Sequence, residues 1–128
     1  MTNGYSVVIS EVSQELTAKE RVMLKDTTNA IKLDELTQKS GEPVTITPAI
    51  YAVLDIHNEQ SDQNKDYKNF IIVDKSGKKF VTSSESFWNS FKDIADEMAG
   101  ESESWSIEVY RVPSRNFKGK EFLNCSIV

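Results

Sequence analysis

The sequence predicts a mainly β fold in which five strands, read from residue 44 onward, are interrupted by one long helix. Three observations lead to this prediction. In several short stretches every second residue is apolar, as in a strand with one face buried. One stretch, residues 84–99, instead repeats apolar residues at helical spacing. Glycine, proline and polar loop residues separate these stretches, so each of them is expected to form one element.

The first 43 residues predict a short α/β extension ahead of these strands. The β-branched run at residues 5–9 indicates an edge strand, which would permit pairing with a second chain in a homo-oligomer. Thr17 and Glu20 have the spacing of a capping box, which predicts a short helix over residues 18–25. A second helical turn is expected over residues 32–38. The segment Ser-Gly-Glu-Pro at residues 40–43 then ends the extension.

The first three strands of the main body follow. Residues 44–56 predict a long strand, and residues 57–65 (HNEQSDQNK) predict a polar loop. Residues 70–73 and 78–82 predict two strands joined by a tight turn, in which Gly77 can adopt a positive φ.

The helix and the last two strands complete the chain. A capping box opens the expected helix over residues 84–99, and Gly100 supplies its left-handed stop. Alternation then predicts strands over residues 105–110 and 122–128, with a loop over residues 114–121 between them. The apolar stripe of the helix comprises Phe87, Phe91, Ile94 and Met98.

Three strands, a helix and two strands are the element order of an OB-fold, a five-stranded Greek-key barrel. We therefore expect one OB-fold-like domain, with residues 1–43 as an N-terminal extension and residues 44–128 as the barrel. The alternative architecture is an open α+β sheet with the helix packed on one face. An OB-fold binds its ligands on strands two and three and on the loops after strands one and four.

Charge is sorted along the chain into blocks, although the net charge is only −5. Residues 1–64 carry a net charge of −5 and residues 83–110 carry −6, whereas residues 65–82 and 111–128 each carry +3. Both basic segments contain aromatic residues as well. Lysine and arginine attract phosphates, and flat rings stack on unpaired bases, so the two segments together would suit a single-stranded nucleic acid.

The candidate contact residues come from these two segments. If Ile71 and Val81 face the core, alternation places Phe70, Lys78 and Phe80 on the outer face; the opposite assignment of the two phenylalanines is equally open. The candidates for binding nucleic acid are Tyr67, Lys68, Phe70, Lys78, Phe80, Arg111, Arg115, Phe117, Lys118 and Lys120.

Catalysis and cofactor binding are not expected. One histidine (His57) and one cysteine (Cys125) cannot assemble a zinc site by themselves. Asp93, Asp96 and Glu97 are better explained as the solvated face of the helix than as metal ligands. No apolar run is long enough to span a bilayer, and no secretory signal is evident, so a cytoplasmic protein without a membrane partner is expected.

The C-terminal part resembles a known family. The stretches FIIVDKSGKKF at residues 70–80 and NFKGKEFLNCSIV at residues 116–128 are similar to segments of the single-stranded-DNA-binding proteins of bacteriophages of Gram-positive hosts. The resemblance covers about residues 50–128. It implies an OB-fold and sequence-independent binding of single-stranded DNA during phage replication or recombination, in the host cytoplasm and alongside other phage replication or recombination proteins. By position, it assigns the contacts to Phe70, Phe80, Phe117, Lys118 and Lys120.

The acidic segments suit a second class of protein. A small acidic interaction module could mimic nucleic acid and occupy a nucleic-acid-binding protein of the host. The two classes differ in the surface that they use: a mimic needs its carboxylates, whereas a binder needs Lys78, Lys118 and Lys120.

Overall fold

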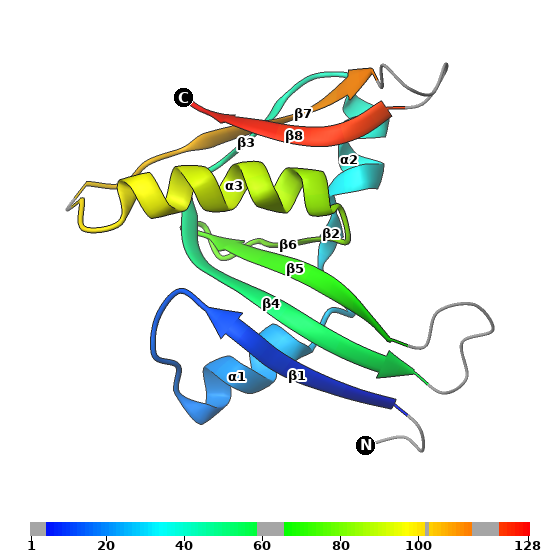
Figure 1. Cartoon of the computed structure of the whole chain (residues 1–128), viewed down its shortest axis with the longest axis vertical. Helices are drawn as coiled ribbons and strands as arrows, with labels where there is room; N and C mark the ends of the chain where they lie inside the picture. Colours follow the sequence, from blue (N-terminus) through cyan, green and yellow to red (C-terminus); the bar gives the residue numbers. More distant parts are fainter. Residues whose placement is uncertain (1–4, 59–65, 102, 114–120) are drawn as a thin grey trace.

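The computed structural model describes residues 5–58, 66–101, 103–113 and 121–128 (Figure 1). Over these ranges the protein is mainly β, as the sequence predicted. The strands are β1 (Tyr5–Val12), β2 (Ile31–Lys32), β3 (Val44–Ile46), β4 (Pro48–Asn58), β5 (Asp66–Asp74), β6 (Lys79–Thr82), β7 (Ile107–Pro113) and β8 (Glu121–Ile127). The helices are α1 (Ala18–Lys25), α2 (Leu33–Ser40) and α3 (Glu85–Met98).

The described strands form two sheets. The larger has the order β1-β4-β5-β6-β2, in which only β2 and β6 run parallel, and the smaller has the antiparallel order β3-β7-β8. Only Thr47 separates β3 from β4, so one bent stretch of chain contributes a strand to each sheet. The helix α3 lies between the two sheets (Figure 1).

The described strands form two sheets that are not closed into the expected five-stranded barrel. The N-terminal region takes up the free edge of the larger sheet. β2 pairs with the edge of β6 through Ile31 opposite Phe80 and Lys32 opposite Val81, so this edge is occupied. α2 packs against both β6 and β7. Residues expected to form an extension are therefore built into the sheet, with β1 as its edge strand beside β4.

Both faces of the larger sheet are buried at the centre of β5. Phe70 and Ile72 belong to the core cluster that includes α3, whereas Ile71 and Val73 belong to a second cluster that includes Leu24 of α1. A continuous apolar run such as Phe-Ile-Ile-Val is typical of a strand covered on both faces.

The predicted helices are confirmed where local signals define them. The capping box expected from Thr82 and Glu85 does not form; Ser84 caps α3 instead, because its hydroxyl accepts a hydrogen bond from the Phe87 amide at 3.3 Å. Gly100 follows α3 with a φ of 92°. Thr17 and Glu20 form the predicted capping box of α1, with bonds of 3.2 and 2.9 Å. No helix in the described ranges is long and apolar enough to cross a bilayer.

Candidate nucleic-acid interface

Two of the candidate stacking residues, Phe70 and Phe80, lie in the core. Each is only 4% exposed. Phe70 stacks instead on Trp88 of α3, with ring centroids 4.8 Å apart and an angle of 11° between the planes. Of the two assignments left open, the structure therefore shows the one that places both rings in the core, because α3 covers this face of the sheet and α1 covers the other.

Lys78 lies in the exposed turn between β5 and β6, far from the end of β7. The Lys75 amide in this turn donates to the Thr47 carbonyl at 2.9 Å, and the Thr47 hydroxyl bonds that of Ser106 at 2.7 Å. Ser106 directly precedes β7, whereas Pro113 ends it. A strand of this length spans about 20 Å. The turn therefore lies about that far from Pro113, at the other end of β7 (Figure 1).

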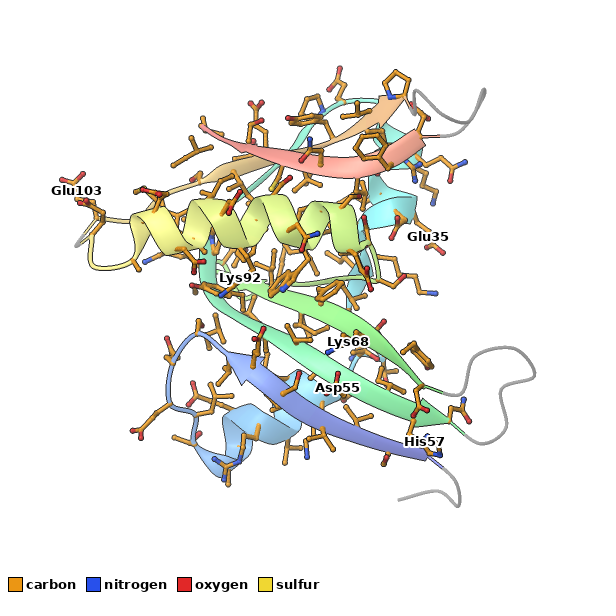
Figure 2. All side chains as sticks on the ribbon, viewed as in Figure 1. Glu35, Asp55, His57, Lys68, Lys92 and Glu103 are labelled. Carbon is orange, nitrogen blue, oxygen red and sulfur yellow. The ribbon has the colours of Figure 1, made fainter. Side chains whose placement is uncertain are left out.

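Tyr67 and Lys68 lie at the start of β5 and point to opposite faces of the sheet. Tyr67 is half-buried against the cluster on the α1 side. The ammonium of Lys68 lies 3.1 Å from the Asp55 carboxylate of β4 (Figure 2). Two rows further along the strands, Asp66 lies opposite His57, and its carboxylate is 2.6 Å from Nδ1 of that residue. These residues border a shallow hollow of about 320 Å³.

Arg111 joins β7 to α2. Its Nε donates to the Thr37 hydroxyl at 3.1 Å and a terminal nitrogen donates to the Asp34 carbonyl at 2.6 Å. The Thr37 side chain is buried. Arg111 therefore holds two elements together, and this role competes with a phosphate contact.

The remaining candidates, Arg115, Phe117, Lys118 and Lys120, lie outside the described residues. The two strands that flank them present a surface that was not singled out from the sequence. Tyr110 of β7 is half-buried and Phe122 of β8 is 38% exposed. Alternation could have identified both, because their neighbours Val109 and Leu123 are core residues.

The described residues hold no group of three or more His, Cys, Asp or Glu side chains that could bind a metal. Asp93, Asp96 and Glu97 are exposed on α3, and Asp96 lies 3.5 Å from Lys92. Desolvation raises the pKa of the buried Cys125 thiol to about 12. This thiol therefore stays protonated at neutral pH and behaves as a small apolar side chain.

No protein-family model matches this chain, and neither the curated proteins nor the solved structures contain a significant match to it.

Proposed function

We propose that this protein binds single-stranded DNA without sequence preference and protects it in the host cytoplasm during phage replication or recombination, without catalysing a reaction. The observation that carries this proposal is the order of the strands. Three antiparallel strands (β4, β5 and β6), then α3, then two antiparallel strands (β7 and β8) follow one another as in an OB-fold, and the bent β3–β4 stretch contributes to both sheets. On this proposal the fold is an open relative of the OB-fold.

The contact residues are proposed mainly in the segment that joins β7 to β8. An OB-fold uses this loop, the one after its fourth strand, to bind oligonucleotides. Residues 114–120 (SRNFKGK) contain three cations, one aromatic ring and no acid. Arg115, Lys118 and Lys120 would contact phosphates, and Phe117 would stack on a base. Lys68 adds a cation near the other OB-fold loop, whereas Phe70 and Phe80 leave the proposed set.

Charge reversal tests this site. We expect Lys118→Glu combined with Lys120→Glu to weaken binding of labelled oligo-dT in fluorescence anisotropy. The dependence of log K on log salt should flatten by about 1.4, because each lost contact on a single strand removes about 0.7 from the slope. Lys19→Glu with Lys25→Glu makes the same change in net charge on α1 and should leave the slope unchanged. Wild-type affinity and slope in the first double variant would refute the site.

A second candidate function is the acidic interaction module. It is favoured by a difference between cations and carboxylates in the described residues: several cations have a partner within the protein, whereas carboxylates on α3 do not. Lys68, Lys79, Lys92 and Arg111 each contact a carboxylate or a backbone carbonyl oxygen within the protein. Along α3, by contrast, the exposed carboxylates of Glu85, Asp93 and Glu97 have no cationic partner among the described residues.

Displacement distinguishes the mimic from the binder. A mimic would release labelled oligo-dT from a host single-strand-binding protein without binding the oligonucleotide itself. Neutralising the three carboxylates (Glu85→Gln, Asp93→Asn and Glu97→Gln) should abolish that release. Direct binding of oligo-dT by the wild type, unaffected by these three changes, would reject the mimic.

A further inference from the structure

We infer that the outer face of β7 and β8 is a stacking platform for two bases of a single-stranded nucleic acid, with Tyr110 and Phe122 as its two rings. This inference rests on the proposed function and names a surface for base contacts in place of Phe70 and Phe80.

The register of the two strands places both rings on the same face. Tyr110 lies opposite Asn124, and Val112 lies opposite Phe122. The neighbouring residues Val109 and Leu123 are buried in the core cluster to which α3 contributes, and alternate residues of a strand point to opposite sides. Tyr110 and Phe122 are therefore diagonal neighbours on the side away from the core, at a separation of about 7–8 Å.

Both rings are presented in a way that suits stacking. Phe122 keeps 38% of its surface exposed, although aromatic rings gain by burial. The Tyr110 hydroxyl lies 2.5 Å from the Ser126 hydroxyl, one row further from Phe122. This hydrogen bond fixes the end of the Tyr110 side chain on this face, and the side chain is half-buried, so that part of it stays exposed.

The charge along this face favours binding of a nucleic acid and limits how much of the face the nucleic acid can cover. The row of Val112 and Phe122 adjoins the chain segment 114–121, whose sequence has three cations and one acid, Glu121, and so carries a net charge of +2. Glu108 stands at the opposite end of the same face, beside Ser126. Phosphates are therefore favoured at the loop end and disfavoured beyond Tyr110, which leaves room for about two bases.

A protein partner fits this face less well. Among the described residues, its accessible apolar part consists of the half-buried Tyr110 and Val112 and the exposed Phe122. A stable protein interface needs a buried area above about 1,000 Å² with a well-packed apolar centre. Base stacking needs only a ring face and tolerates polar neighbours such as Asn124 and Ser126.

Ring-preserving and ring-deleting variants test the platform. Phe122→Leu and Tyr110→Leu should each weaken binding of oligo-dT about fivefold or more, the lower end of the effect of one base stack. Phe122→Trp and Tyr110→Phe keep a ring and should bind within about twofold of the wild type. Val8→Ala, at an exposed apolar position on β1, serves as the control and should bind like the wild type. Thermal melts of every variant report on folding.

Photocrosslinking gives a second readout that does not depend on the substitutions. Oligo-dT carrying 5-iododeoxyuridine, irradiated with the wild-type protein, should form adducts on the peptides that contain Tyr110 or Phe122. Failure of the wild type to bind oligo-dT would refute the proposed function and the platform together. Binding by the wild type, with leucine variants that bind equally well or with adducts exclusively elsewhere, would overturn the platform alone.

Discussion

Phe70 of β5 and Trp88 of α3 form a stacked pair, with centroids 4.8 Å apart and planes within 11° of parallel. The ring face that was expected to receive a base is therefore already stacked on an indole. Both residues belong to the same core cluster, so this pair fixes α3 on the sheet. A ring at this position stabilises the fold, and base contacts must come from elsewhere on the molecule.

Phe70 and Phe122 should respond in opposite ways to the same substitution. Phe70→Leu should lower the free energy of unfolding by about 1–3 kcal/mol, because it removes buried ring surface and leaves a poorly filled space. The affinity of the folded variant for oligo-dT should stay at the wild-type value. Phe122→Leu should change the free energy of unfolding by less than about 0.5 kcal/mol while weakening binding. Urea denaturation combined with anisotropy checks both. Reduced affinity of Phe70→Leu at unchanged stability would contradict the assignment of Phe70 to the core.

Lys79 and Lys78 are neighbours with different roles. The ammonium of Lys79 donates to the carbonyl oxygens of Met23 and Asp26 at the C-terminal end of α1, where a positive charge is favourable. Lys79→Met should therefore lower the free energy of unfolding by about 1 kcal/mol. Lys78→Met, in the exposed turn, is the matched control and should change it by less than about 0.5 kcal/mol. Equal effects of the two substitutions in urea denaturation would show that the contact with α1 contributes nothing.

Thr82 is a buried polar residue that connects β6, α2 and the start of α3. Its hydroxyl donates to Asp34 Oδ2 at 2.9 Å and accepts from the Ser84 amide at 3.1 Å. Thr82→Val removes both bonds and should destabilise the fold by about 1–3 kcal/mol, because two polar groups lose their partner. The same substitution at the exposed Thr45 of β3 should be close to neutral. A Tm of Thr82→Val equal to that of Thr45→Val would contradict the role of this hydroxyl.

Asp74 makes the β5–β6 turn sensitive to acid. Partial desolvation raises the pKa of its carboxyl, but hydrogen bonds from Ser76 and the Lys78 amide, together with the charge of Lys78, outweigh this effect. The net pKa is lowered from 3.8. A carboxyl whose pKa is lower in the folded state stabilises the fold above its unfolded pKa, and this stabilisation is lost as the pH falls through the folded value.

Asp74→Asn should therefore have a lower Tm than the wild type at about pH 6, and the difference should shrink as the pH falls below about 4. Thermal melts across this range test the prediction. A Tm difference that stays constant at all pH values would exclude the ionised carboxylate as the cause.

Local signals in the sequence predicted the elements that depend on neighbouring residues. The capping box of Thr17 and Glu20, the stripe from Phe87 to Met98 and the turn at Gly77 all lie within a few residues of what they determine. The pairing of Val12 with Ala52 and of Ile31 with Phe80 joins residues about 40 or more positions apart. Nothing in either local sequence specifies such a partner, so these two strand pairings could not be predicted.

Only part of the candidate site could be predicted, and the reason is again that local sequence does not show what covers a strand. A run such as Phe70–Val73 has no polar residue to mark an outer face, so alternation alone could not decide which side is exposed. Both sides turned out to be covered. β7 and β8 do alternate, and there the pattern could have placed Tyr110 and Phe122 outside, although neither was singled out from the sequence.

The most direct test of the central proposal is a titration of labelled oligo-dT with the wild-type protein, followed by anisotropy at low and moderate salt beside a duplex of equal length. The account predicts tight binding of the single strand that weakens as salt rises, together with much weaker binding of the duplex. No binding of the single strand at low salt, or equal binding of both, would contradict it.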